Sequence, residues 1–159
     1  MTMAILPLEP LVVRCPDPDS TSRLGRALGS VAAAGDVVCL WGDLGAGKTH
    51  LAKAFGAGLG VTDTITSPSF ILMAEYAGRL PLFHIDLYRL ADAGDALAGG
   101  LIDERQAEGV TLVEWPDRMG ELLPAARLDV TIDGTGDEPR TIGFRAGDAS
   151  LARYLEAIP

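Results

Sequence analysis

The sequence contains no asparagine, and only two of its 159 residues are lysines, Lys48 and Lys53. The missing asparagine excludes the NKxD motif by which GTPases normally recognise guanine. The formal net charge is -9, so the surface as a whole repels polyphosphate backbones and anionic membranes. The remaining positive charge is spread over arginines that form no run. These features argue against a chain that binds nucleic acid by itself.

Cysteines and long apolar runs are also scarce. Cys15 and Cys39 are far apart, and without a CxxC motif they give little support to a disulfide or a zinc site. The apolar stretch AILPLEPLVV is interrupted by prolines and a glutamate, so neither a membrane span nor a signal peptide is expected. Since 48% of the residues are hydrophobic, the chain can bury a core at this length. We expect a cytoplasmic protein with one domain over residues 1–159.

The hydrophobic pattern alternates between the helix and strand periods. Cap-type residues at Asp19 and Ser20 come before apolar positions at helical spacing, which predicts a helix that ends at Gly35. The run DVVCLWG is too short for a helix and is rich in β-branched residues, which predicts a strand covered on both faces. Further elements are predicted as follows: a helix over 48–60, a hairpin of strands 70–76 and 80–86, a weak helix within 92–109, strands over 110–115, 128–132 and 141–144, and a helix over 150–158.

The segment between the first strand and the next helix, LWGDLGAGKTH, carries the clearest motif. Gly42, Gly47, Lys48 and Thr49 satisfy GxxxxGK[ST], a phosphate-binding loop when it joins a strand to a helix. The residue frequencies of this chain give a chance match of about three in a thousand. The predicted fold class is therefore α/β: a P-loop NTPase-type three-layer sandwich with a mostly parallel central sheet, one β-hairpin insertion and a small C-terminal strand and helix extension.

The physical logic of this loop predicts its ligands, ATP and Mg²⁺. Its glycines allow the backbone to lie flat against an anion, so that amide N–H groups and the helix N-terminus point at the phosphates. Lys48 is expected to contact the β and γ phosphates, and the Thr49 hydroxyl to ligate magnesium. The predicted nucleotide-binding residues of the loop are Gly42, Asp43, Leu44, Gly45, Ala46, Gly47, Lys48, Thr49 and His50.

A phosphate loop needs a further carboxylate to organise magnesium and the attacking water. Asp86 and Glu114 each follow an apolar run, and ligands of open α/β sheets bind at the carboxyl ends of the strands. The alternative reading of each residue is a helix or turn cap. Together with Lys48 these two residues are the predicted catalytic set, and with Thr49 they are the predicted metal ligands.

Four motifs in order, GDLGAGKT, SPSF, HIDLYRL and VEWPDR, resemble the TsaE family of bacterial ATPases. The resemblance runs from about Asp17 to Ile132. It implies an ATP-binding α/β protein needed for threonylcarbamoyladenosine (t6A) modification of tRNA beside the anticodon. It also implies that the chain acts with the TsaB and TsaD proteins, is slow alone and stimulated by them, and meets tRNA only through that complex.

The resemblance assigns roles residue by residue. Asp86 matches the Walker B-like aspartate of the family, and Glu114 matches an acidic residue that ligates magnesium or positions water. Trp115 matches the family tryptophan, and Ser69 stands in a loop that senses the γ phosphate where the family usually has threonine. His50 replaces a frequent second threonine, a change expected to matter little because the first hydroxyl carries the metal.

Several readings stay open on the sequence alone. His84 is either a catalytic base or a local hydrogen-bonding group, and Tyr88 with Arg89 forms either a partner surface or a core anchor. Residues 17–21 and 138–140 are placed near the adenine by analogy only. A small-molecule kinase and a passive nucleotide-gated binding module remain alternatives to the partner-stimulated ATPase.

Overall fold

A computed structural model of the chain describes residues 11–43, 45–65, 73–88 and 104–159. Leu44, Ser69 and Arg89, which the sequence analysis singled out, lie outside these ranges. Within them, seven strands form one sheet in the order β1-β7-β6-β2-β5-β4-β3. The strands are β1 Leu11–Cys15, β2 Val37–Trp41, β3 Met73–Tyr76, β4 Leu82–Asp86, β5 Val110–Glu114, β6 Leu128–Asp133 and β7 Arg140–Ala146.

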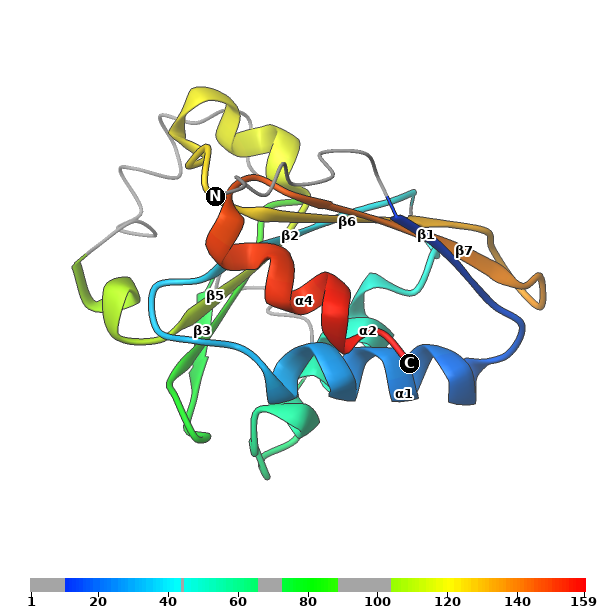
Figure 1. Ribbon diagram of the computed structural model, residues 1–159, viewed down its shortest axis with the longest axis horizontal. Helices are drawn as coiled ribbons and strands as arrows, with labels where there is room; N and C mark the ends of the chain where they lie inside the picture. The colour runs from blue at the N-terminus through cyan, green and yellow to red at the C-terminus, as the bar shows by residue number, and fades with distance from the viewer. Residues whose placement is uncertain (1–10, 44, 66–72, 89–103) are drawn as a thin grey trace, which may run out of the picture.

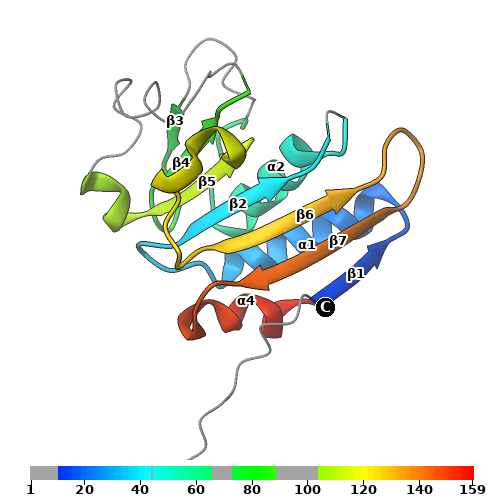
Figure 2. The same cartoon turned by 90° about the horizontal axis from the view of Figure 1, so that it is seen from above.

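The centre of the sheet is parallel, as predicted. Strand β2 pairs in parallel with β5 on one side and β6 on the other, and β5 pairs in parallel with β4. The two edges are antiparallel, since β7 and β1 extend one side and β3 turns back on β4. The expected hairpin is thus confirmed as β3 and β4, with its described part shorter than predicted. Figure 2 shows the strands side by side with helices beneath them.

Helices and 3₁₀ turns cover the two faces unequally. In Figure 1, α1, α2 and α4 lie on one side of the sheet and the turn η2 lies on the other. The elements are α1 Pro18–Ser30, α2 Lys48–Gly58, η1 Glu104–Glu108, η2 Pro116–Leu122, η3 Ala149–Leu151 and α4 Ala152–Ala157. No described helix is long and apolar enough to span a bilayer. The three-layer α/β class predicted from the sequence is confirmed.

Strand β2 is buried on both faces. Val38 and Leu40 join the core cluster beneath α1 and α2, and Cys39 points to the opposite cluster with Ile85 and Val113. This alternation follows from the two-residue period of a strand, which sends successive side chains to opposite faces. A continuous apolar run is therefore what a central parallel strand requires.

The first helix begins and ends earlier than its pattern predicted. Asp17, not Asp19 or Ser20, is the N-cap: its carboxylate accepts a hydrogen bond of 2.8 Å from the Ser20 amide, and Pro18 begins the helix. Proline is preorganised for the first helical position, which explains the earlier start. The helix ends at Ser30, and Gly35 instead adopts a left-handed φ of 89° in the turn before β2.

The C-terminal segment is built into the sheet. Val38 of β2 is in register with Leu128 of β6, so the strand predicted as part of a C-terminal extension borders the central strand. The expected weak helix is seen only as η1 at residues 104–108, and the earlier part of it lies outside the described ranges. The turn η2 after Trp115 had no counterpart in the prediction.

Candidate functional site

The phosphate loop lies at the carboxyl end of β2 and leads into α2. Gly45 and Gly47 have φ values of 83° and 101°, a left-handed conformation that side-chain-bearing residues rarely adopt. Gly47 is the N-cap of α2 and supplies no side-chain hydrogen bond to the first turn. The amide groups at the start of an α-helix have no partner within the helix, so this end of α2 presents N–H donors to an anion.

Lys48 is buried, with only 6% of its surface exposed. Its Nζ donates hydrogen bonds to the backbone oxygens of Gly42, at 2.6 Å, and Asp43, at 2.9 Å. Burial lowers the pKa of this amine, while the nearby carboxylates, Glu114 foremost, act in the opposite direction. The ammonium group is thus held against the backbone of the loop.

The indole ring of Trp115 also contacts the Lys48 ammonium group. The Lys48 Nζ lies 4.2 Å from the centroid of the indole ring, a cation–π distance. Trp115 follows the end of β5 with φ 59° and ψ 52°, and it is the one described non-glycine residue with positive φ. Tyr88, which is half-exposed, packs against it in a tilted arrangement with ring centroids 4.9 Å apart. Backbone strain of this kind is typical of functional sites.

The two predicted carboxylates end neighbouring strands. Asp86 and Glu114 are register partners in the β4–β5 pair, next to β2 and its loop. The Thr49 hydroxyl lies 3.3 and 3.4 Å from the two carboxylate oxygens of Glu114, which is almost fully buried. Asp86 accepts a hydrogen bond of 3.0 Å from the Tyr88 amide, so it also caps the turn after β4. The fold therefore brings Lys48, Thr49 and Glu114 together.

His84 contacts Glu114 directly. Its Nε2 lies 2.6 Å from Glu114 Oε2, and the imidazole is completely buried. The other ring nitrogen, Nδ1, has no hydrogen-bond partner among the described residues. The sequence left open whether His84 is a catalytic base or a hydrogen-bonding group. The structure shows the hydrogen bond, made to Glu114.

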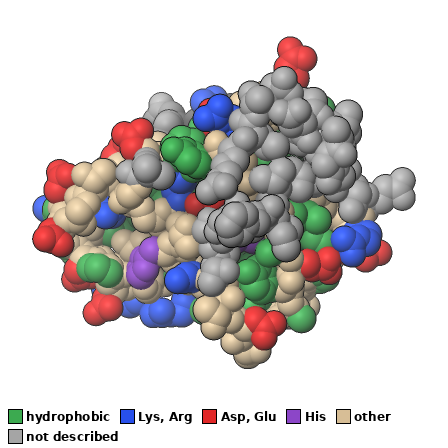
Figure 3. Space-filling model, turned by 180° about the vertical axis from the view of Figure 1, so that it is seen from behind, with side chains coloured by type: hydrophobic (Ala, Val, Ile, Leu, Met, Phe, Trp, Pro, Cys, Tyr) green, Lys and Arg blue, Asp and Glu red, His purple; other side chains and the backbone are tan. Residues whose placement is uncertain are grey.

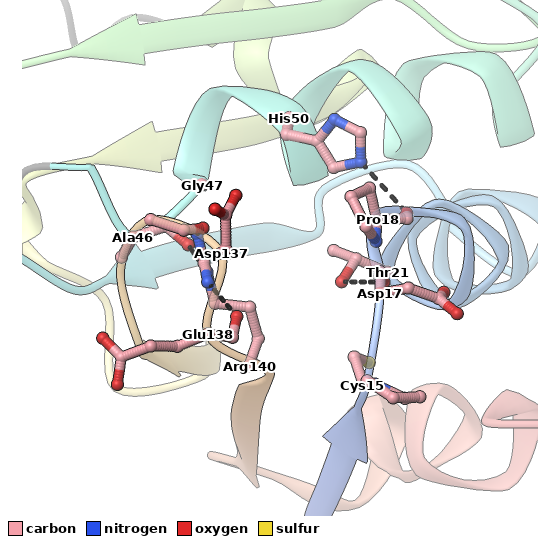
Figure 4. Close-up of a pocket in the computed structure, with 12 residues that line it drawn as sticks. Cys15, Asp17, Pro18, Thr21, Ala46, Gly47, His50, Asp137, Glu138 and Arg140 are labelled. Carbon is pink, nitrogen blue, oxygen red and sulfur yellow. Dashed lines mark hydrogen bonds between the residues drawn. The ribbon is translucent and has the colours of Figure 1, made fainter.

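A cavity of about 220 Å³ adjoins the loop, between the start of α1 and the turn that joins β6 to β7. Figure 4 shows His50 of α2 extending toward Pro18 on one side, and Arg140 on the other. The two segments placed near the adenine by analogy thus line a single cavity. The lining residues include Cys15, Asp17, Thr21, Ala46, Gly47, Gly136, Asp137 and Glu138.

His50 has more contacts than the sequence suggested. Its Nε2 lies 3.0 Å from Ser22 Oγ and 3.2 Å from the Pro18 oxygen, so it links α2 to the start of α1. A threonine side chain is too short to span this gap. The replacement at position 50 therefore shapes one wall of the cavity.

Arg140 joins the β6–β7 turn to the phosphate loop. Its Nε donates to the Ala46 oxygen at 2.8 Å, and its terminal nitrogens donate to the backbone oxygens of Glu138 and Gly136. The sequence analysis had placed residue 140 near the adenine and had not predicted this contact with the loop. No local signal identifies it, because 94 positions separate Arg140 from Ala46.

The donors at this site suit magnesium bound together with phosphate. The Thr49 hydroxyl and the carboxylates of Glu114 and Asp86 are the hard oxygen ligands that Mg²⁺ prefers. Within the described ranges, no group of three or more histidine, cysteine, aspartate and glutamate side chains is arranged to hold a metal by itself.

Comparison with known proteins gives consistent matches over most of the chain. The family model described as "Threonylcarbamoyl adenosine biosynthesis protein TsaE" matches residues 15–142. The tRNA threonylcarbamoyladenosine biosynthesis protein TsaE of Bacillus subtilis is 41% identical over 140 residues, which cover 87% of each chain. The protein of the same name from Nostoc is 46% identical over 129 residues, covering 77% of this chain and 76% of the relative.

Comparison with solved structures agrees with these matches. The crystal structure of Bacillus subtilis YdiB superposes with a TM-score of 0.76 at 36% identity, and the alignment covers 93% of both chains. Because the family model and the full-length relatives agree, the chain belongs to the TsaE family, whose members take part in the biosynthesis of threonylcarbamoyladenosine in tRNA.

Proposed function

We propose that this chain is a magnesium-dependent ATPase with low intrinsic activity that acts as a partner-stimulated switch on the TsaB–TsaD complex. The observation that carries the proposal is the convergence of Lys48, Thr49 and Glu114 at the uncapped start of α2. These groups provide, in order, a cation for phosphate, a hydroxyl for magnesium and a carboxylate within reach of both. Magnesium, when bound, would neutralise charge on the transferred phosphoryl group.

Each residue has a defined role in this proposal. Lys48 moves from the loop carbonyls that it contacts here to the β and γ phosphate oxygens. Thr49, Asp86 and Glu114 hold magnesium directly or through water, and Glu114 also orients the attacking water. The cavity between α1 and the β6–β7 turn accommodates the ribose and adenine, because it flanks the loop at Ala46 and Gly47. Ser69, outside the described ranges, is proposed to sense the γ phosphate.

The switch role rests on the weakness expected of the site by itself. Arg140, the arginine that contacts the phosphate loop, is held by backbone carbonyls. An arginine supplied by a partner is a common means of stimulating such a loop. We propose that TsaB and TsaD complete the site, that tRNA is met only through them, and that the reaction takes place in the cytoplasm.

The test is magnesium-dependent ATP hydrolysis by the purified protein, alone and with TsaB and TsaD from the same organism. Turnover is expected to be slow alone and strongly raised by the partners. Lys48→Ala is the blank, and Lys53→Ala, which removes the exposed second lysine of α2, is the matched control. ATP binding without any stimulation would overturn the proposal in favour of a passive nucleotide-gated module, and phosphate transfer to a small acceptor would indicate a kinase.

Glu114→Ala tests the carboxylate separately. This variant is expected to bind ATP and to lose stimulated turnover by about 100-fold or more, the range typical of a group that assists proton transfer. The two readouts are nucleotide affinity from a fluorescent ATP analogue and turnover in the presence of the partners. Wild-type turnover in Glu114→Ala would remove this residue from the mechanism.

A further inference from the structure

We infer that His84 is a positioning residue: the hydrogen bond from its Nε2 fixes the orientation of the Glu114 carboxylate toward Thr49 and the proposed magnesium position. This inference rests on the proposed function, because it assigns Glu114 to the site of Mg²⁺ and ATP. It gives His84 a role in organising the site without contact to substrate.

The geometry of the pair supports this assignment. His84 Nε2 and Glu114 Oε2 are 2.6 Å apart, a short distance for a hydrogen bond to a carboxylate. Both side chains are buried, so solvent does not compete for the contact. The Thr49 hydroxyl lies 3.3 Å from Oε1 and 3.4 Å from Oε2. His84 therefore holds the carboxylate at Oε2 while both of its oxygens face Thr49.

The contact with Glu114 identifies which atom of the ring is the donor. An ionised carboxylate only accepts hydrogen bonds, so a separation of 2.6 Å between Nε2 and Oε2 requires a hydrogen on Nε2. Without that hydrogen, lone pairs on the two atoms would face each other. The imidazole is thus set as a donor toward the carboxylate.

The sheet explains why β4 supplies this residue. His84 and Asp86 are two positions apart on β4 and point to the same face of the sheet, toward α2. In the parallel register His84 faces Leu112, so Glu114 lies one diagonal step further along β5. One strand therefore contributes both a predicted metal ligand and the group that orients the carboxylate on its neighbour.

The first experiment compares three variants at position 84. The side-chain nitrogen of glutamine falls near Nε2 of histidine and that of asparagine near Nδ1, so His84→Gln keeps the hydrogen bond and His84→Asn does not. His84→Leu removes the donor at similar volume. The measurement is the Mg²⁺ dependence of binding of a fluorescent ATP analogue, from which an apparent affinity for Mg²⁺ is obtained. We expect this affinity to fall by about 10–100-fold in the Leu and Asn variants, the effect typical of losing a residue that hydrogen-bonds a metal ligand. We expect His84→Gln to recover most of it.

Thr111→Val is the matched control. This buried β5 residue has a hydroxyl without a hydrogen-bond partner among the described residues, so its replacement tests the effect of altering the interior on the strand that carries Glu114. Its Mg²⁺ dependence is expected to match the wild type. Affinity for the nucleotide without Mg²⁺ is expected to be unchanged in all variants. If His84→Leu fails to fold, the comparison of Gln with Asn carries the test.

A double-mutant cycle with Glu114→Gln separates a positioning role from general disruption. If His84 acts through Glu114, the double variant His84→Leu with Glu114→Gln is no weaker in Mg²⁺ dependence than Glu114→Gln alone. Additive losses, or a folded Leu variant with wild-type Mg²⁺ dependence, would overturn the inference. Equal rescue by Asn and Gln would do so as well.

A nucleotide-free measurement keeps the inference distinct from the proposed function. Long-range ¹H–¹⁵N spectra of His84 are expected to show the Nε2–H tautomer in the wild type and a changed signal in Glu114→Ala. An Nδ1–H tautomer would overturn the inference whatever the protein does with ATP. The protein could also show the expected spectra and yet bind no Mg²⁺-ATP. That result would overturn the proposed function but not the hydrogen bond between His84 and Glu114.

Discussion

At the scale of single residues, this site is organised mainly by contacts between side chains and backbone oxygens. Lys48 donates hydrogen bonds to two carbonyl oxygens of the loop. Arg140 donates to three carbonyl oxygens, one in the loop and two in the β6–β7 turn. Such contacts hold a glycine-containing loop whose own residues offer little side-chain packing. The loop geometry therefore depends on residues distant in the sequence as well as on its glycines.

Replacing Arg140 by alanine is expected to loosen the phosphate loop. The nearly buried Ala46 would lose the hydrogen-bond donor to its backbone oxygen, which costs about 1–3 kcal/mol when a buried acceptor is left unpaired. The two measurements are the free energy of unfolding, from urea denaturation, and the affinity for ATP. Both are expected to fall. Arg145→Ala, on an exposed position of the same strand, is the control. Unchanged ATP affinity in Arg140→Ala would show that this arginine does not support the loop.

At the scale of elements, α1 and α2 are held at close range by glycines. A Cβ built on Gly29 would lie 2.1 Å from the Phe55 oxygen, and one on Gly58 would lie 2.1 Å from the Arg26 oxygen. Both obstacles are backbone atoms, so no change of rotamer relieves them. This close packing fixes α2, and with it the phosphate loop, against the first helix.

Gly29→Ala is therefore expected to destabilise the protein by about 2–3 kcal/mol or more, the cost of overpacking a core. Alanine normally stabilises a helix interior relative to glycine by up to about 1 kcal/mol, so a loss here reports the clash. Gly143→Ala is the control, since nothing lies within 4 Å of its added Cβ. Chemical denaturation gives both free energies, and a more stable Gly29→Ala would contradict the packing seen here.

The C-terminal helix α4 is anchored by a buried carboxylate. Asp36 Oδ2 accepts hydrogen bonds from the Tyr154 hydroxyl, at 2.5 Å, from Arg153 and from the Ala33 amide. Burial and then the contact with Asp36 raise the pKa of Tyr154 far above its ordinary value of 10.0. The helix is thus attached to the turn before β2 by a phenol that stays protonated in the folded chain.

This anchor predicts an alkaline loss of stability. The unfolded chain releases the Tyr154 proton near pH 10, whereas the folded chain retains it, so the stabilisation is complete below that pH and declines above it. The free-energy difference between the wild type and Tyr154→Phe is expected to shrink by about 1.4 kcal/mol per pH unit above pH 10. Unfolding curves of the two proteins across this range measure it. A constant difference would mean that the phenol ionises in the folded chain as well.

At the scale of the whole molecule, acidic charge is the dominant surface property. Figure 3 shows acidic side chains over the edges of the face seen from behind, with Lys and Arg among them in no continuous patch. A net charge of -9 disfavours direct contact with a polyanion. We propose that docking onto TsaD uses complementary charge, with the partner supplying the more basic surface.

Association with the partners is then expected to weaken, mainly through a slower on-rate, as ionic strength rises. Surface plasmon resonance at low and high salt measures both rates, and ATP binding in the same buffers shows that the protein stays intact. An association that does not depend on salt would count against charge-driven docking.

The features that are local in the chain can be predicted from the order of its residues. The phosphate loop, the strand before it and the helix after it are contiguous, so their residue types and periods reveal them directly. The two-residue spacing of His84 and Asp86, and the ends of β4 and β5, were readable for the same reason. The positions of Asp86 and Glu114 at strand ends and the α/β class with a parallel sheet centre agree with the structure.

Which distant residues contact one another is visible in the folded protein alone. The contact of His84 with Glu114 spans 30 positions and that of Arg140 with Ala46 spans 94, and both depend on strand order and register. The start of the first helix was also predicted wrongly. Asp17 is the N-cap and Pro18 the first helical residue, where the sequence had suggested Asp19 and Ser20 as caps. Local patterns encode elements and loops, whereas the pairing of side chains across a sheet is settled by the free energy of the whole fold.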